Sequence, residues 1–143
     1  TTLSLIAALG AVLLIGIVVK SGIVLVDFIN LRRAEGLPHP ASYDFFVQKG
    51  IERDMHPYGA CYHDLSERQS TGVIEFLKMN GIETVLVGGL ATDYCVKTTA
   101  LQLRRAGFQV VVNLSACRGI APDTVDAAIG EMRDAGVAVV ENI

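Results

Sequence analysis

Cys95 is the residue of this chain whose type and position best suit chemistry. The apolar run at residues 84–87 is followed by Gly88-Gly89 and then by a helical pattern that continues to Ala106. This order predicts a strand, a tight glycine turn and a helix, with Cys95 in the first turn of that helix. Unpaired N–H groups and the positive dipole end of a helix stabilise a thiolate there. Cys95 is therefore a candidate nucleophile, although an arbitrary cysteine in a turn is more often a small buried residue.

A lysine and an aspartate follow two other strand-like segments. Lys49 comes shortly after residues 43–47, which are rich in aromatic and β-branched side chains, and Asp27 ends the apolar run 22–26. The carboxyl ends of parallel strands meet at one edge of a sheet, where ligands of open α/β sheets bind. We therefore expect Lys49 beside Cys95, and Asp27 joins them if residues 22–26 form a strand. The alternatives are a solvated lysine and an interfacial carboxylate at the end of a membrane helix.

The segments that must position these residues alternate between strand and helix. Helical patterns begin near Ser70, after the glycine turn and at Pro122, and each one ends at a glycine. Residues 49–69 show no clear period and are predicted to form a long functional loop. This alternation predicts an α/β fold with right-handed crossovers and a parallel sheet of about four strands. The strands are expected at residues 43–47, 84–87, 108–112 and 137–140.

Length and composition exclude several classes of protein. The chain has 143 residues, which suits one domain, and its net charge of −3 gives no reason to expect nucleic acid as a partner. Three cysteines without regular spacing do not suggest a disulfide framework, and they favour a reducing compartment, the cytoplasm. The hydrophobic fraction of 51% is high, and the excess lies at the start of the chain.

The apolar run at residues 3–29 is interrupted only by Lys20 before it reaches Asp27. A helix needs about 20 apolar residues to cross a bilayer, so the run is long enough to do so. Arg32-Arg33 would then mark a cytoplasmic flank. We therefore predict an apolar N-terminal helix and membrane contact through residues 3–29. The alternative is that this run covers an exposed face of the sheet.

Residues 88–113, GGLATDYCVKTTALQLRRAGFQVVVN, resemble the nicotinamidases of the isochorismatase-like cysteine hydrolases. Phe46-Val47-Gln48-Lys49-Gly50 resembles the strand end that carries the catalytic lysine of that family. The resemblance covers about residues 38–143 and implies a partial isochorismatase-like, Rossmann-like three-layer fold. It implies that Cys95 is the nucleophile and Lys49 the catalytic lysine. Asp27 would correspond to the catalytic aspartate, which ends the first strand in the family.

The resemblance also implies a reaction, the hydrolysis of a small carboxamide such as nicotinamide to the acid and ammonia. Asp27 would take the proton of Cys95, the thiolate would attack the carboxamide carbon, and water would cleave the resulting thioester. Backbone N–H groups of the turn would hold the oxyanion beside a cis peptide bond between Ala91 and Thr92. Tyr58 matches a loop tyrosine near the substrate pocket of the family.

The divalent metal of the family, such as zinc, is bound through an aspartate and histidines that lie between the first strand and the lysine. Here Asp27 and Lys49 are only 22 positions apart, so that segment is missing. We therefore predict no metal site and an impaired enzyme. His56, Cys61 and His63 lack a fourth ligand with the spacing that would close a zinc cluster.

Residues 14–36, LIGIVVKSGIVLVDFINLRRAEG, resemble a transmembrane helix of the resistance-nodulation-division efflux transporters. This second resemblance covers about residues 1–36. The predicted organisation is a transmembrane-like segment at 1–33, a seam at 34–38 and a truncated hydrolase domain at 39–143. A natural fusion, a misassembled reading frame and an artificial chimera all fit this order.

Three functions stay open at this point. The chain is a cysteine amidohydrolase with a small carboxamide substrate, an inactive truncated hydrolase, or a membrane segment with an incidental downstream part. A homo-oligomer is left open as well.

Overall fold

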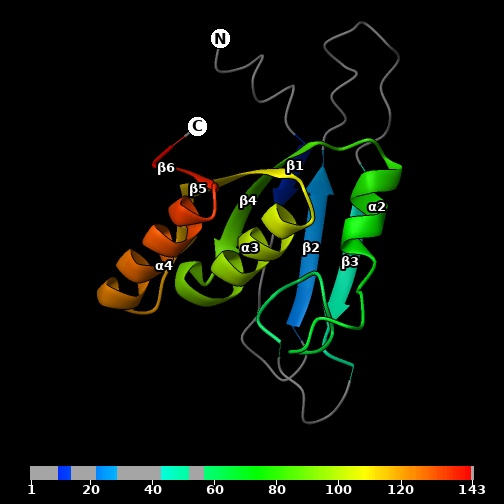
Figure 1. Ribbon diagram of the computed structural model, residues 1–143, viewed down its shortest axis with the longest axis horizontal. Coiled ribbons are helices and arrows are strands. Elements are labelled where there is room, and N and C mark those ends of the chain that lie inside the picture. The colour runs from blue at the N-terminus through cyan, green and yellow to red at the C-terminus, as the bar shows by residue number, and fades with distance from the viewer. Residues whose placement is uncertain (1–9, 14–21, 29–42, 52–56, 143) are drawn as a thin grey trace, which may run out of the picture.

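The computed structural model describes residues 10–13, 22–28, 43–51 and 57–142 (Figure 1). Four strands form a fully parallel sheet in the order β1-β4-β5-β6. Two further strands, β2 and β3, form a separate antiparallel pair. The strands are β1 (Gly10–Leu13), β2 (Gly22–Phe28), β3 (Tyr43–Lys49), β4 (Thr84–Leu90), β5 (Gln109–Arg118) and β6 (Ala138–Val140).

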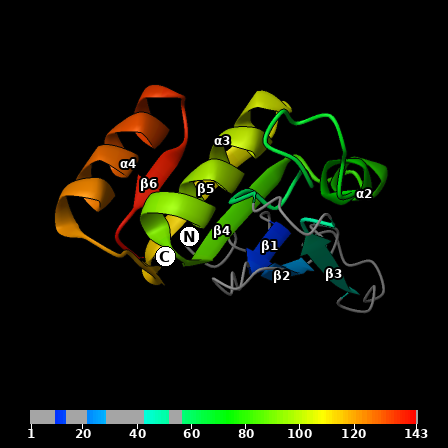
Figure 2. The same ribbon diagram turned by 90° about the horizontal axis from the view of Figure 1, so that it is seen from below.

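Helices alternate with the strands of the main sheet. α2 (Val73–Met79) precedes β4, a π-helical turn η2 (Thr92–Val96) leads into α3 (Lys97–Arg105), and α4 (Pro122–Asp134) precedes β6. The connections through α3 and α4 advance in one direction across the sheet. Right-handed crossovers therefore place both helices on one face, as Figure 2 shows.

The core lies between that face of the sheet and the helices. Alternate residues of β4 and β5 point inward and meet apolar side chains of α3 and α4. The fully buried members include Val85, Val87, Val110, Val112, Leu103 and Met132. This burial fixes β4 and α3, the two elements that flank Cys95.

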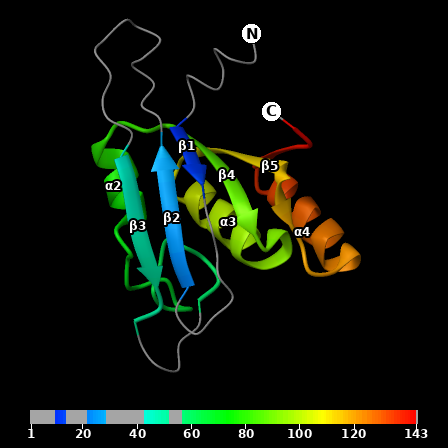
Figure 3. The ribbon, with the colours of Figure 1, turned by 180° about the vertical axis from the view of Figure 1, so that it is seen from behind.

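The α/β fold with a parallel sheet is confirmed, but its composition differs from the prediction. Residues 43–47 were expected in the main sheet, yet they belong to β3, which pairs with β2 instead. β1 occupies the fourth place, beside β4. Figure 3, which shows the molecule from behind, presents the strands with the helices on their far side. The third layer of the expected fold is therefore not seen in the part of the chain that the structure describes.

The prediction of one apolar N-terminal helix is wrong for the described residues of that segment. Residues 10–13 and 22–28 form strands β1 and β2. Apolar, β-branched runs suit a buried strand as well as a helix, and pairing with β4 and β3 decides between them here. Within the described ranges, no helix combines the length and the apolar character needed to cross a membrane. The predicted seam at 34–38 lies outside the described residues.

Candidate active site

Lys49 and Cys95 meet in the structure, although 46 positions separate them. Lys49 Nζ lies 3.1 Å from Cys95 Sγ and donates a hydrogen bond to it. Lys49 is only 5% exposed, so it is not the solvated lysine of the alternative interpretation. Cys95 is partly exposed, which leaves the sulfur open to a reactant. The structure therefore places a buried amine within hydrogen-bond distance of a partly exposed thiol, a pair suited to nucleophilic chemistry.

The strand directions explain why these two residues meet. Figure 1 shows the arrows of β3 and β4 pointing the same way, although the two strands belong to different sheets. Lys49 is the last residue of β3, and Cys95 lies in the η2 turn that follows β4. Both therefore lie at the carboxyl ends of strands on one edge of the molecule, as the sequence predicts.

Asp27 does not reach this edge. Residues 22–28 do form a strand, but β2 runs antiparallel to β3 and in the opposite direction to β4 (Figure 1). The register pairs Gly22 with Lys49 and Asp27 with Asp44. A strand rises about 3.3 Å per residue, so five positions put Asp27 roughly 17 Å along the strand from Lys49. The expected meeting of all three residues needed a parallel strand, and the antiparallel pairing prevents it.

The turn that carries Cys95 differs in two details from the sequence-based expectation. It is a π-helical turn, in which Val96 N–H donates to the Ala91 carbonyl oxygen at 3.0 Å, before α3 begins at Lys97. The cis peptide bond joins Leu90 to Ala91, one position before the expected Ala91-Thr92 bond. Both bonds lack proline, so no residue type marks which of them is cis. Ala91 and Thr92 are both buried at the start of this turn.

Asp93 anchors the turn to α4, a role that the sequence analysis missed. Its carboxylate is 2% exposed and accepts hydrogen bonds from Thr124 Oγ1 at 2.6 Å and from the N–H groups of Ile120 and Ala121 at 3.1 and 3.3 Å. Burial acts to raise the pKa of Asp93. The hydrogen bonds from Thr124, Ile120 and Ala121 outweigh burial and hold that pKa below its ordinary value. An aspartate fully engaged in this way is a structural anchor rather than a base for Cys95.

Tyr58 contributes to the site in two ways. Its carbonyl oxygen accepts a hydrogen bond of 2.6 Å from Lys49 Nζ, so the backbone of the loop directs the lysine. Its side chain is half-exposed, and the centroid of its ring lies 5.3 Å from the ring centroid of Tyr94, at an interplanar angle of 49°. Tyr94 immediately precedes Cys95, so an aromatic pair lies close to the nucleophile. The position of Tyr94 beside Cys95 in the sequence was the signal that could have identified it.

The other two thiols lie in different surroundings. Cys61 and Cys117 are buried. Burial raises the pKa of the Cys61 thiol to about 12, and the nearby carboxylates of Glu67 and Glu75 add to the effect. Burial also raises the pKa of Cys117. Neither is suited to act as a nucleophile at neutral pH.

The metal that the family resemblance implies finds no donor set in the described residues. Within those ranges, no three His, Cys, Asp or Glu side chains come together. Nδ1 of His63 accepts a hydrogen bond of 3.2 Å from Gly50 N–H, which fixes the imidazole on the backbone next to Lys49. His56 lies outside the described residues.

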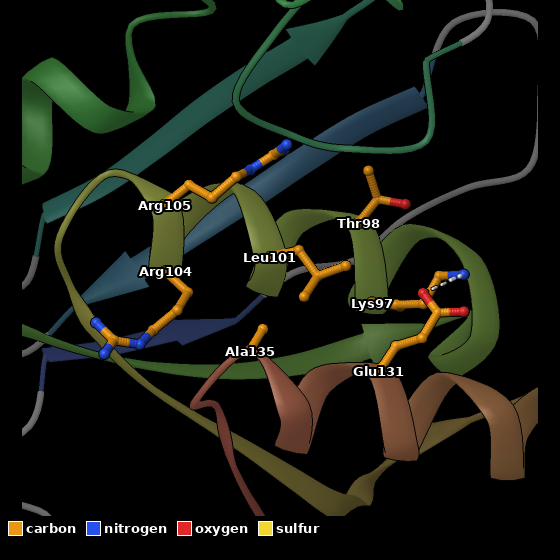
Figure 4. Close-up of a pocket in the computed structure, with 7 residues that line it drawn as sticks. All are labelled: Lys97, Thr98, Leu101, Arg104, Arg105, Glu131 and Ala135. Carbon is orange, nitrogen blue, oxygen red and sulfur yellow. Dashed lines mark ion pairs between the residues drawn. The ribbon is translucent and has the colours of Figure 1, made fainter.

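A concavity lies between α3 and α4, and neither Lys49 nor Cys95 is among its lining residues (Figure 4). It has a volume of about 590 Å³, and an ion pair of 3.4 Å between Lys97 and Glu131 crosses it. Its lining mixes charged and apolar side chains, namely Lys97, Thr98, Leu101, Arg104, Arg105, Glu131 and Ala135. Figure 4 shows Lys97 directed toward Glu131 of α4, whereas Thr98 and Arg105 point away from α4.

Comparisons with known proteins identify the family of this chain. Residues 54–142 match the model of the isochorismatase domain family. The nicotinamidase of Escherichia coli (strain K12) is 32% identical over an alignment of 127 residues, and the match covers 73% of this chain and 60% of that protein. The nicotinamidase of Acinetobacter baylyi is 36% identical over an alignment of 86 residues, and the match covers 57% of this chain and 40% of that protein.

Solved structures show the same likeness. PnC1 from L. infantum in complex with nicotinate matches with a TM-score of 0.62 and 31% identity over 66% of this chain and 46% of that one. A nicotinamidase of Acinetobacter baumanii matches with a TM-score of 0.62 and 35% identity over 66% of this chain and 45% of that one. The chain thus spans 40% to 60% of the length of the two curated nicotinamidases. The match over residues 54–142 shows that the chain belongs to the isochorismatase domain family.

Proposed function

We propose that this chain is a cysteine amidohydrolase that cleaves a small carboxamide of the nicotinamide type. The observation that carries the proposal is the 3.1 Å contact between the buried Lys49 Nζ and the accessible Cys95 Sγ. The nicotinamidase names of its relatives support the substrate class. The Tyr58–Tyr94 pair supports it too, because aromatic side chains suit a flat aromatic ring.

The proposed reaction has two halves. In the first half Cys95, held by Lys49 Nζ, attacks the carboxamide carbon as a thiolate, and the nitrogen takes up a proton from solvent water and leaves as ammonia. In the second half a water molecule attacks the thioester carbon, the C–S bond breaks, and the carboxylic acid and the thiolate are released while one proton returns to solvent. N–H groups of the turn at residues 91–95 would stabilise the oxyanion in both halves. The Tyr94 N–H is excluded, because it already donates to the Ala91 carbonyl oxygen.

We further propose that the activity is low. General acid–base catalysis contributes about 10²–10⁴-fold in rate, and Asp27 is far from Cys95 in the register of β2 and β3. Asp93, the acid within the nucleophile turn, is held by its hydrogen bond from Thr124 of α4. The described residues therefore place a nucleophile and a cation, but no carboxylate, at Cys95.

Ammonia release from nicotinamide by the purified chain tests this function. Cys95→Ala should abolish the release, and Lys49→Met should reduce it strongly, because each removes one partner of the contact. Cys117→Ala and the exposed-lysine variant Lys78→Met are the matched controls and should stay near the wild-type rate. Asp27→Asn should have little effect.

Two outcomes would contradict the proposal. A rate that survives Cys95→Ala would mean that another group or a contaminant performs the hydrolysis. No ammonia release from a folded wild-type chain would favour the alternative of an inactive truncated hydrolase. A strong loss in Asp27→Asn would instead restore Asp27 as the base.

A further inference from the structure

The helical stretch formed by η2 and α3 carries Cys95, and the same face of this stretch contacts the loop at residues 58–61, which directs Lys49. Cys95, Thr99 and Gln102 are spaced by four and three residues along η2 and α3, which places them on the same face. Thr99 and Gln102 are only 2% and 4% exposed, although both side chains are polar. Buried polar groups persist in proteins where they are hydrogen-bonded, so their partners indicate their role.

Both side chains bind the backbone of the loop that follows Lys49. Thr99 Oγ1 accepts a hydrogen bond from Ala60 N–H at 3.0 Å, and Gln102 Oε1 accepts one from Cys61 N–H at 3.2 Å. Gly59 lies so close to the Gln102 amide that a Cβ atom at this position would overlap it. Three consecutive loop residues are thus fixed against α3.

The same stretch of loop positions the lysine. Tyr58, which precedes Gly59, receives the 2.6 Å hydrogen bond from Lys49 Nζ through its carbonyl oxygen. The same Nζ reaches Cys95 Sγ at 3.1 Å. A lysine side chain is long and has many rotamers, so a fixed carbonyl acceptor selects the one that reaches the sulfur.

We propose that Thr99 and Gln102 are positioning residues for the reaction of Cys95. They hold residues 59–61 against α3, so that the Tyr58 carbonyl directs Lys49 at the sulfur. The helix that presents the nucleophile thereby also sets the position of its cation. This inference deepens the proposed function and rests on it, but the reactivity of Cys95 tests it separately from amidase activity.

The test uses near-isosteric variants of the full chain with matched controls. Thr99→Val removes the acceptor for Ala60 N–H, and Thr99→Ser retains it. Thr98→Val makes the same change one position away, at a partly buried threonine that lines the concavity beside α3. Gln102→Met is compared with Gln109→Met, which lies on the exposed side of β5. The measured quantity is the rate constant for alkylation of Cys95 by iodoacetamide at neutral pH, assigned by peptide mapping.

We expect Thr99→Val and Gln102→Met each to slow alkylation of Cys95 by about three- to tenfold, because a displaced Lys49 no longer holds its 3.1 Å contact with the attacking sulfur. Thr99→Ser and both controls should alkylate like the wild type. In a Lys49→Met background, Thr99→Val should have no further effect, because the cation that it positions is already gone. A loss through general destabilisation would persist in that background.

Wild-type alkylation in a folded Thr99→Val chain, or an equal loss with and without Lys49, would overturn the proposal. If Thr99→Val does not fold, Gln102→Met is tested in the wild-type and in the Lys49→Met background. The proposal then requires that Gln102→Met slows alkylation of Cys95 only where Lys49 is present. Where ammonia release is measurable, kcat should fall with little change in KM, since the substrate is not touched by either side chain. A wild-type chain without amidase activity would remove the proposed function and leave the alkylation comparison intact.

Discussion

Replacing Asp93 by asparagine should weaken the hydrogen bonds between the nucleophile turn and the start of α4, and so lower the free energy of unfolding. The cap position of α4, Ala121, has no side chain that can cap the helix. Asp93 supplies the missing acceptor from outside, through its bonds to Thr124 Oγ1 and to the N–H groups of Ile120 and Ala121. Its negative charge also lies at the positive end of the helix dipole. The substitution keeps the shape and one acceptor oxygen but removes the charge.

The expected loss follows from these contacts. A hydrogen bond to a charged group contributes about 1.5–3 kcal/mol, and a neutral one contributes about 0.5–1.5 kcal/mol. Applying that difference to the 2.6 Å bond from Thr124, and adding about 0.3–1 kcal/mol for the dipole, gives a loss of about 1.5–2.5 kcal/mol. Asp93→Ala removes every acceptor and should lower the free energy of unfolding by about 3–4 kcal/mol.

The pH dependence of this loss separates the charge from the shape. The pKa of Asp93 is lowered in the folded state, so its stabilising contribution is complete above its unfolded value of about 3.9. The contribution disappears as the pH falls through the folded-state value. The difference between wild type and Asp93→Asn should therefore be full at pH 7 and shrink below about pH 4.

Urea unfolding followed by circular dichroism, at pH 7 and at acid pH, measures these differences. Asp123→Asn is the matched control, because Asp123 is an exposed acid in the first turn of α4 and should contribute only through the dipole, about 1 kcal/mol or less. A loss in Asp93→Asn no larger than that of the control would refute the reasoning. A difference that stays constant down to acid pH would show that charge is not its cause.

The remaining predictions concern the thiols and two glycines. Limited alkylation at neutral pH should label Cys95 before Cys61 and Cys117, because burial raises the pKa of the latter two; first labelling of either would contradict this. Gly119→Ala should lower the free energy of unfolding by about 1–3 kcal/mol, since its Cβ would overlap a valine of α4 and approach the Asp93 carboxylate. Gly130 lies in α4 with open space at its Cβ position, so Gly130→Ala should raise the free energy of unfolding by about 0.5–1 kcal/mol. If urea unfolding gave the same change in free energy for Gly119→Ala and Gly130→Ala, the steric argument would be wrong.

Local sequence signals predicted the order of elements from residue 84 onward. The apolar β-branched runs, the glycines at 81, 107 and 136 and Pro122 predict β4, α3, β5, α4 and β6 in the observed order. The end of β5 is the largest difference, because the strand continues to Arg118, six residues beyond the expected end at Val112. Hydrophobic periodicity and turn residues act over short distances, so a single sequence contains them. The glycine turn and its cysteine are also local, which is why the nucleophile and the family could be identified early.

The pairing of strands was beyond the reach of the sequence. Residues 22–28 are equally suited to a helix and to a strand, and residues 43–49 to a parallel or an antiparallel neighbour. Those choices depend on contacts between segments far apart in the chain. The antiparallel register of β2 and β3 is what separates Asp27 from the site.

The sequence by itself therefore determined the family, the nucleophile turn and the lysine that follows a strand. Only the tertiary structure decided which polar residues surround Cys95. Thr99 and Gln102 look like ordinary helix residues until their partners Ala60 and Cys61 are known, and Asp93 looks like a surface acid until α4 packs on it. Hydrogen bonds between segments far apart in the chain form only when the core has brought those segments together, so no local pattern of residues predicts them.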